Sequence, residues 1–306
     1  MQELIEKSLA QVGEVLVGKR HQVEQAMACL LAGGHLLIED LPGMGKTVLS
    51  QALARTLGLT FNRIQFTSDV LPADILGISV FDRDSGSFEF HPGPIFAQVL
   101  LADEINRTTP KTQSALLEAM EEAQVTVEGA TRPLPHPFFV IATQNPVTQA
   151  GTYPLPESQL DRFLMRIELG YPDAAAEREI IRGIDRRVML DGLEPCLGAE
   201  ELLRLQQQAA EIRISDPLLD YVQRLVQHSR QDPSFAWGLS PRGALALVRA
   251  ARAWALIRGR QHAIPEDVQA VLPAVVEHRL REHADHGRSG GEALSQRLLA
   301  VVDAVG

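Results

Sequence analysis

The distribution of hydrophobic residues divides the chain into two parts. Up to about Tyr171, short continuous apolar runs alternate with segments whose apolar residues recur every three or four positions. Continuous runs bounded by turn residues are typical of parallel strands covered on both faces, and the longer spacing is typical of helices. The predicted strands are His35–Glu39, Phe61–Phe66, Gln98–Glu104 and Phe138–Gln144. This alternation predicts a doubly wound α/β domain over residues 1–171.

After about Pro172 the strand-like runs are absent, and helix start signals replace them. A residue that can cap a helix precedes proline at Asp216-Pro217 and Ser240-Pro241, and Ile264-Pro265-Glu266 gives a third start. The tail shows the apolar spacing of one more helix after a break rich in Gly and Ser. Residues 172–306 are therefore expected to form a small all-α domain with a C-terminal helix.

Two segments of the first part alternate polar and apolar residues around turn signals. They are Ile78–Phe90, with a turn at 84–86, and Gln124–Pro135, with a turn near Gly129. Each is expected to be a hairpin inserted into the α/β domain. Surface decoration is one interpretation, but the aromatic residues Phe88 and Phe90 favour a role in contacts.

Composition supports a globular protein and narrows the class of partner. The 306 residues are 45% hydrophobic and 22% charged, enough for one large or two ordinary domains. The net charge of −10 argues against broad nucleic-acid binding without excluding a local basic patch. The N-terminus lacks the features of a signal peptide, and no apolar run approaches the roughly 18 residues of a membrane span. Two cysteines without metal spacing, Cys29 and Cys196, fit a reducing cytoplasm.

The strongest chemical signal follows the first predicted strand. Gly45-Lys46-Thr47 ends a phosphate-binding pattern, G-x-x-x-x-G-K-[ST], but Asp40 stands where the first glycine is expected. The loop follows a strand and opens a helix, so backbone N–H groups from Gly43 onward would surround phosphates. Lys46 would reach the β- and γ-phosphates, and Thr47 would ligate Mg²⁺. A strand-turn-helix that uses glycine for tight geometry is the alternative.

Polar residues after later strands favour the nucleotide interpretation. Asp103 at a strand end would hold the Mg²⁺ shell, and Glu104 is placed to polarise a water for attack on the γ-phosphate. Asn145 follows the next strand, at the edge where ligands bind in such sheets. Arg162 carries a guanidinium suited to phosphate oxygens, although its position alone favours a surface pair with Asp161.

These motifs together resemble the MoxR family of AAA+ ATPases. The resemblance runs in order from about Val17 to Leu280 and rests on the segments EDLPGMGKT, LLADEINRTTPKTQSALLEAMEE, FFVIATQNPVTQAGTYPLPESQLDRF and YPD. An acidic residue before xPGxGKT is normal in this family, which accounts for Asp40. The implied fold is a P-loop NTPase three-layer sandwich with a parallel sheet, followed by a small helical lid.

The resemblance also implies the role of each site residue. Walker A is at Lys46 and Thr47, Walker B at Asp103 and Glu104, and sensor 1 at Asn145. The implied arginine finger is Arg162, and Arg242 in LSPRGALAL is the implied sensor 2 at the start of a lid helix. The implied nucleotide contacts are Pro42, Gly43, Met44, Gly45, Lys46, Thr47, Val48 and Asp103, with Thr47 and Asp103 as the Mg²⁺ ligands.

A protein with these features is expected to bind ATP and Mg²⁺, to assemble into a ring, which the resemblance implies is a hexamer, and to remodel a partner. Relatives in this family act on proteins with a von Willebrand factor A domain, in maturation or cofactor insertion.

Three other functional classes are alternatives to a ring ATPase that remodels a partner. An ATP-gated scaffold with little turnover is disfavoured by Glu104, Asn145 and Arg162. A DNA-directed motor is disfavoured by the acidic balance and the lack of a basic or helix-turn-helix module. Magnesium-chelatase motor subunits match LADEINR and ATQNP less well.

Overall fold

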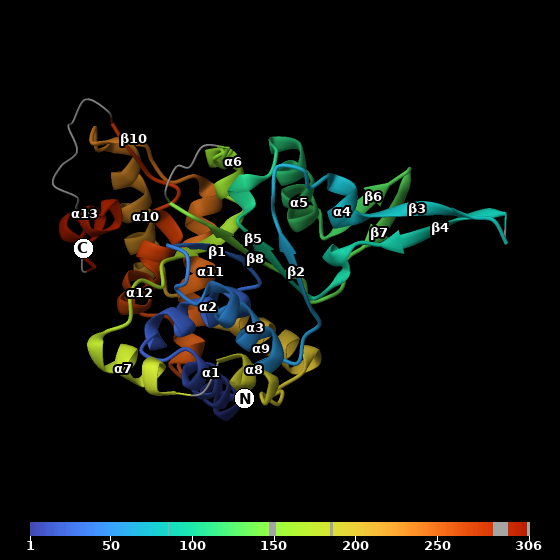
Figure 1. The fold of residues 1–306 in the computed structure, drawn as a ribbon. Helices are drawn as coiled ribbons and strands as arrows, with labels where there is room; N and C mark the ends of the chain where they lie inside the picture. The colour runs from blue at the N-terminus through green and yellow to red at the C-terminus, as the bar shows by residue number, and fades with distance from the viewer. Residues whose placement is uncertain (85, 147–150, 184–185, 284–292, 305–306) are drawn as a thin grey trace.

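A five-stranded parallel sheet forms the centre of the molecule (Figure 1). The computed structural model describes residues 1–84, 86–146, 151–183, 186–283 and 293–304. The strand order is β2-β5-β8-β1-β9. The strands are β1 (His35–Glu39), β2 (Phe61–Gln65), β5 (Val99–Asp103), β8 (Phe139–Gln144) and β9 (Phe163–Ile167). The first four confirm the predicted strands, and β9 is a further strand that the hydrophobic pattern did not predict.

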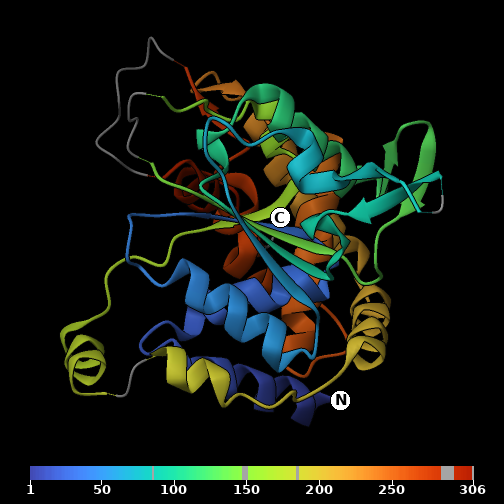
Figure 2. The same ribbon diagram turned by 45° about the vertical axis from the view of Figure 1, so that its right-hand side comes forward.

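Helices cover both faces of this sheet and give three layers (Figure 2). Leu36 and Ile38 of β1 belong to one buried cluster, whereas Leu37 between them belongs to the other. Successive side chains of a strand point to opposite faces, so a strand covered on both faces has to be apolar throughout. One face carries α1 (Gln2–Val15), α2 (Arg20–Leu31) and α3 (Lys46–Thr56), and the other carries α4 (Pro72–Leu76), η1 (Pro94–Phe96) and α5 (Pro110–Glu122).

The second domain is mainly helical and packs beside α2 through α9 and α11. Ser240 caps α11 by accepting a hydrogen bond from the Gly243 N–H at 3.0 Å, and Pro241 is the first helical residue, as predicted. The helices are α7 (Ala174–Arg182), α8 (Arg186–Asp191), α9 (Ala199–Glu211), α10 (Asp216–Gln231), α11 (Pro241–Ile257), α12 (Pro265–Val276) and α13 (Leu294–Val301). Among the described residues, no helix is long and apolar enough to cross a membrane.

The lid differs from the predicted all-α domain in one detail. The antiparallel strands β10 (Phe235–Trp237) and β11 (Arg281–Glu282) form a small ribbon in it. Strands of two or three residues are too short to show a hydrophobic period, which explains why the sequence did not reveal them. We propose the division between the two domains at residue 171, in the connection from β9 to α7.

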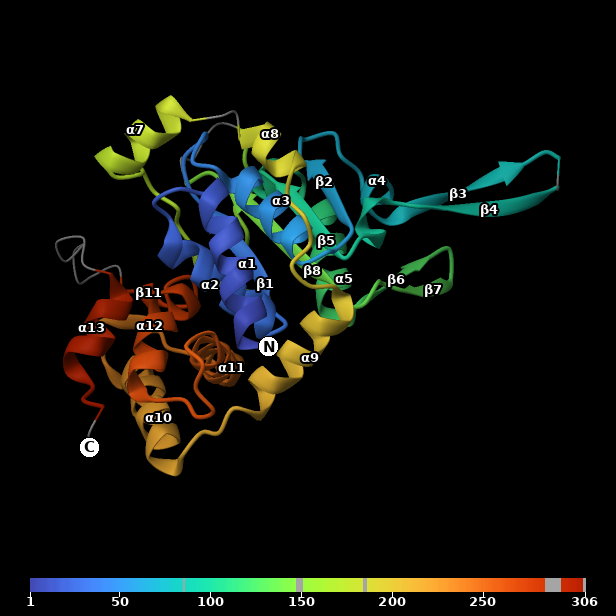
Figure 3. The ribbon, with the colours of Figure 1, turned by 90° about the horizontal axis from the view of Figure 1, so that it is seen from below.

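Both predicted hairpins are present, and they extend from the α/β domain on the side away from α10–α13 (Figure 3). One pairs β3 (Gly77–Asp82) with β4 (Ser87–Pro92), and the other pairs β6 (Gln124–Val127) with β7 (Ala130–Pro133). Arg132 of β7 lies over the Phe90 ring of β4, with 3.8 Å between its guanidinium carbon and the ring centroid. The two hairpins therefore touch, while Phe88 is exposed.

Candidate nucleotide site

The phosphate-binding loop joins the end of β1 to the start of α3. Gly43 and Gly45 have φ angles of 84° and 91°, in the left-handed region that favours glycine. This turn lets α3 begin at Lys46, so the unpaired N–H groups of its first turn lie at the loop and favour an anion there. The Lys46 ammonium donates to the backbone carbonyls of Asp40 and, at 3.5 Å, of Gln144.

Acidic side chains surround the Lys46 ammonium. Burial lowers the pKa of Lys46, and the carboxylates of Asp40, Asp103 and Glu104 oppose that change. The carboxyl ends of β1 and β5 lie at the same end of the sheet, because both strands run parallel to β8 between them. The strand register agrees, since Glu39 pairs with Gln144 at the ends of β1 and β8.

Asp40 has a structural task that a glycine cannot perform. Its carboxylate accepts hydrogen bonds from the backbone N–H groups of Leu41 at 2.7 Å, Leu169 at 2.7 Å and Gly170 at 2.6 Å. Leu169 and Gly170 follow β9 and lead into the lid. The residue that departs from the usual phosphate-loop pattern therefore ties the loop to the connection between the domains.

Asp103 ends β5, and its carboxylate is held from two sides. Thr143 of β8 donates to one oxygen at 2.5 Å, and Arg63 of β2 donates to the other at 2.6 Å and 3.2 Å. A carboxylate and a threonine hydroxyl are the hard oxygen ligands that Mg²⁺ prefers, so Asp103 and Thr47 fit this ion. An ion bound at Asp103 would share or displace the contact with Arg63.

Glu104 leaves the line of the strand because its backbone is left-handed, with φ 57°. Its backbone N–H donates to the Thr143 hydroxyl at 2.9 Å. Its carboxylate accepts from Gln65 of β2 and from Arg107 of η2 (Ile105–Arg107), each at 3.0 Å. The carboxylate is therefore restrained by two side-chain donors at the same edge of the sheet as the phosphate loop.

Asn145 directly follows β8, which lies between β1 and β5. Its backbone carbonyl accepts from the Asn106 side chain at 3.4 Å, and the residue is half-buried. A residue at the end of the middle strand stands between the phosphate loop and the acidic pair. The structure thus brings Lys46, Asp103, Glu104 and Asn145 to one edge of the sheet.

The two predicted arginines, Arg162 and Arg242, lie at the opposite end of the sheet, where the parallel strands begin. Arg162 follows α6 (Glu157–Leu160) and immediately precedes β9, whose Phe163 pairs with His35 at the start of β1. The phosphate loop begins where β1 ends, five residues further on. At about 3.3 Å per residue, about 16 Å of strand separates the two edges. This exceeds the reach of an arginine side chain, so Arg162 cannot contact a phosphate in its own loop.

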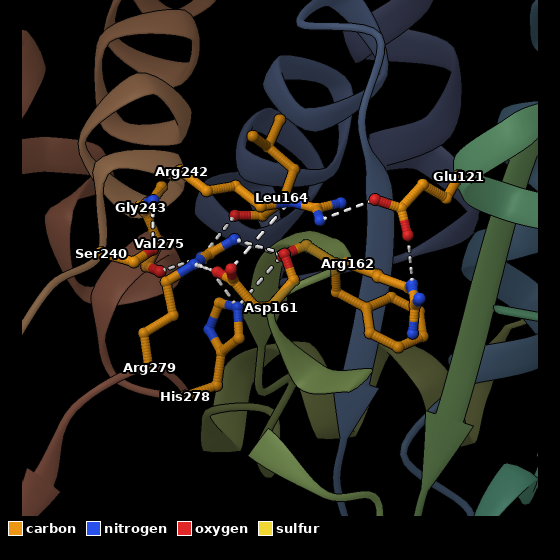
Figure 4. A network of polar contacts seen from close by, with 11 residues as sticks. Glu121, Asp161, Arg162, Leu164, Ser240, Arg242, Gly243, Val275, His278 and Arg279 are labelled. Carbon is orange, nitrogen blue, oxygen red and sulfur yellow. Dashed lines mark hydrogen bonds and ion pairs between the residues drawn. The ribbon is translucent and has the colours of Figure 1, made fainter. Parts of the chain in front are cut away.

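Glu121 near the end of α5 binds both arginines (Figure 4). It accepts from Arg162 Nε at 2.8 Å and from Arg242 Nη1 at 3.1 Å, and these contacts hold the pKa of Glu121 below its usual value. A cavity of about 350 Å³ opens here, lined by several arginines that include Arg249. The surface pair of Arg162 with Asp161 does not form, because Asp161 binds Arg279 instead.

Sequence reasoning missed the residues that hold the acidic pair and the one that binds both arginines. Arg63, Gln65 and Thr143 come from strands beside β5, and Glu121 comes from a helix before β8. Gln65 gave one weak signal, since it is a polar residue at the end of a predicted strand. The others could not be found because the sequence does not state which strands are neighbours.

Comparisons with known proteins agree with this arrangement. The model of the ATPase family associated with various cellular activities (AAA) matches residues 35–165, and the AAA lid domain model matches residues 227–297. Chaperone MoxR1 of Mycobacterium tuberculosis is 44% identical over 285 residues, covering 90% of this chain and 75% of that protein. The chain belongs to the MoxR family of AAA+ ATPases.

Other members and a solved structure extend the likeness over the whole chain. The uncharacterised protein YeaC of Bacillus subtilis is 46% identical to this MoxR-family chain, over 98% of this chain and 94% of its own length. A solved protein from Cytophaga hutchinsonii, assigned as an ATPase, is 36% identical with a TM-score of 0.88, covering 99% of this chain and 95% of that one. The expected AAA+ fold, a parallel sheet between helices followed by a helical lid, is confirmed.

Proposed function

We propose that this MoxR-family protein hydrolyses Mg²⁺-ATP in a ring of identical subunits, a hexamer, and that turnover remodels a partner protein. Membership of the family supports an AAA+ ATPase with a chaperone-like function. The M. tuberculosis relative is named a chaperone. The finer points, which are hydrolysis, the ring and the partner, rest on the geometry of the chain and on the resemblance to its family.

The observation that carries the proposal is the separation of the site into two halves. Lys46, Asp103 and Glu104 lie at one edge of the sheet, whereas Arg162 and Arg242 share Glu121 at the other. Phosphoryl transfer needs positive charge on the transferring group, and arginine fingers contribute about 10³–10⁵ in rate in other systems. A second subunit that offers its arginine edge to the first subunit's loop would complete the site.

Within one subunit, the loop would bind the nucleotide. Backbone N–H groups from Gly43 to Thr47 and the contacts of Pro42, Met44 and Val48 would cradle it, and Lys46 would exchange its two carbonyl partners for phosphate oxygens. Thr47 and Asp103 would hold Mg²⁺, which when bound neutralises phosphate charge.

Glu104 would accept the proton of the attacking water, and Asn145 would orient that water from the neighbouring strand end. The contacts of Glu104 with Gln65 and Arg107 stabilise its carboxylate and fix its direction.

We propose that Arg242 acts in the neighbour's site together with Arg162. Both bind the same carboxylate, and among the described residues Arg162 donates to it only through Nε. Both terminal Nη groups of Arg162 are then available to a phosphate of the next subunit. Arg162 belongs to the α/β domain and Arg242 to α11 of the lid, so both domains of one subunit would contact the phosphate bound by the next subunit.

A mixing experiment tests the composite site. Lys46→Ala subunits lack a pocket but keep the arginines, and Arg162→Ala subunits keep the pocket but lack the finger. Each alone should hydrolyse ATP very poorly, and their mixture should regain activity once co-purification of two tags has shown subunit exchange. A mixture no more active than the sum of its parts would mean that Arg162 acts within its own chain or not at all.

The partner proposed from the family resemblance is a protein with a von Willebrand factor A domain, and the proposed compartment is the cytoplasm. The exposed hairpin aromatics, such as Phe88, support a contact role for the inserts. A purified protein of this domain class, encoded beside this gene, should raise the ATP turnover rate severalfold. Unchanged turnover and no co-elution would remove that class of partner, and a bound but inert complex would favour an ATP-gated scaffold.

A further inference from the structure

Arg279 connects the lid to the segment that carries Arg162 (Figure 4). It lies just after α12, and its side chain is only 5% exposed. Its Nε donates to the Asp161 carboxylate at 2.7 Å, and its Nη2 donates to the Phe163 carbonyl at 2.6 Å. A single lid guanidinium thus holds the residues on both sides of Arg162 without touching Arg162 itself.

Further contacts extend this link in both directions. Arg279 Nη1 also reaches the Leu164 carbonyl at 3.2 Å, His278 Nε2 at 2.8 Å and the Val275 carbonyl, which belongs to α12. On the far side, the second oxygen of Asp161 lies 4.0 Å from Arg242 Nε. The Asp161 carboxylate of the α/β domain therefore lies between two lid arginines, Arg279 and Arg242.

The chemistry of the guanidinium suits positioning better than packing. Burial lowers the pKa of Arg279, and its hydrogen bond and ion pair with Asp161 oppose that change. A buried charge gives little net stability compared with apolar side chains of similar volume. What arginine adds is a rigid planar fork of donors, which fixes the relative direction of every group it binds.

His278 adds a second lid contact at the same place. Its Nε2 lies 3.1 Å from the Phe163 carbonyl and 2.8 Å from Arg279 Nη1, so the tautomer decides whether it donates to the carbonyl or accepts from the arginine. Burial followed by the charge of Arg279 holds the pKa of His278 well below its usual value. The ring is therefore neutral at physiological pH, so Arg279 is the cation of this link. Arg279 attaches the start of β9 to the lid in either tautomer of His278.

We propose that Arg279 is a positioning residue that couples the lid to the arginines offered to the next subunit. It fixes Asp161 and the start of β9, and through them it sets the direction of Arg162, whereas Arg242, itself a lid residue on α11, meets the same Asp161 carboxylate at 4.0 Å. The inference rests on the composite site proposed above and adds a route to it. A lid movement in one subunit would change the arginines at its neighbour's phosphate, which passes a signal around the ring in one direction.

The variants are chosen to cut this link and nothing else. Arg279→Lys keeps the positive charge but loses the fork. Asp161→Asn cuts the ion pair, since the amide keeps one acceptor oxygen but carries no charge, and it serves as a second variant at a less buried residue. Arg281→Lys is the matched control, since Arg281 forms a lid-to-core pair with Glu157 at 3.0 Å that is about half exposed and does not contact the start of β9.

The readout is an asymmetry in mixed rings. Donor subunits carry Lys46→Ala and supply arginines, and receiver subunits carry Arg162→Ala and supply the pocket. Arg279→Lys on the donor should lower the recovered turnover about tenfold or more, because a misplacement of about 1 Å can change rates about a hundredfold. The same change on the receiver should alter turnover less than about twofold. The KM for ATP should stay constant in both arms.

Each outcome decides the question. A donor-only loss with Arg279→Lys and with Asp161→Asn, together with no loss for Arg281→Lys, supports the proposal. Equal losses in both arms would show that Arg279 serves only the fold, and no loss in either arm would overturn the link. No recovered turnover in the parent mixture of Lys46→Ala and Arg162→Ala would instead overturn the composite site, and this proposal with it.

Discussion

Replacement of Asp40 by glycine would restore the usual phosphate-loop pattern, and we expect it to weaken the protein. Asp40 is only 8% exposed, and two of its three hydrogen bonds come from the Leu169 and Gly170 N–H groups of the domain connection. Glycine cannot supply either acceptor oxygen. The substitution therefore leaves the N–H of Leu169, a residue that is 1% exposed, without its partner.

The size of the effect follows from these contacts. A hydrogen bond to a charged group contributes about 1.5–3 kcal/mol, so the two bonds to the connection together stabilise the fold by at least about 3 kcal/mol. Glycine adds a further loss of roughly 0.5–1 kcal/mol because it makes the unfolded chain more flexible. Asp40→Gly should therefore lower the free energy of unfolding by at least roughly 3.5–4 kcal/mol. The free energy of unfolding of Asp40→Asn, which keeps one acceptor oxygen, should lie between those of the wild type and Asp40→Gly.

Urea unfolding followed by tryptophan fluorescence measures this directly. Asp84→Gly is the control, because Asp84 is an exposed aspartate in the turn of the first hairpin. ATP affinity should fall less than stability, since the acceptor that Asp40 offers to Lys46 is a backbone carbonyl that glycine also has. An Asp40→Gly protein as stable as wild type would refute the role assigned to this carboxylate.

The remaining predictions concern nucleotide binding, hydrolysis and pH. Lys46→Ala should weaken ATP binding about ten- to a hundredfold by calorimetry with the fold intact, because it loses a charge-assisted contact of about 1.5–3 kcal/mol; near-wild-type affinity would remove Lys46 from the site. Glu104→Gln should bind ATP normally yet hydrolyse it about a hundredfold more slowly or worse in a phosphate-release assay, because the amide is a poor base; wild-type turnover would assign the base to another residue. His35 receives the Val140 N–H on Nδ1 and donates from Nε2 to the Met120 carbonyl, and burial lowers its pKa from 6.5 to about 4. The neutral ring thus stabilises the fold above pH 6.5, and this contribution is lost as pH falls toward 4, by about 1–2 kcal/mol at pH 5. The free energy of unfolding of His35→Gln should therefore fall less than that of the wild type as the pH is lowered, and an identical pH profile in the variant would contradict this.

Local sequence was sufficient for the central strands and for the loop. Leu36, Leu37 and Ile38 are consecutive apolar residues, and only a strand covered on both faces needs such a run. Gly43 and Gly45 mark the turn because its positive φ angles are readily adopted by glycine and rarely by other residues. Walker A and the acidic pair Asp103-Glu104 could be found because each is contiguous in the chain and follows a strand of strong pattern.

Positions that depend on strand order were beyond the sequence. β8 lies between β1 and β5, so residues that the chain separates by a hundred positions become neighbours. This is why Arg63 and Thr143 at Asp103 were not predicted. β9 was missed as well, because its segment FLMRI includes Arg166, whose pair with Glu39 at 2.7 Å only the folded sheet provides.

The sequence by itself determined the chemistry available to this protein: a phosphate loop, an acidic pair, an amide and two arginines in the order of the MoxR family. The tertiary structure decided how these groups are divided. Parallel strands carry their first and last residues to opposite edges of a sheet, so Arg162, which precedes β9, lies away from Lys46, which follows β1. Contacts across elements, such as Glu121 with both arginines, depend on distances in space that no local pattern encodes.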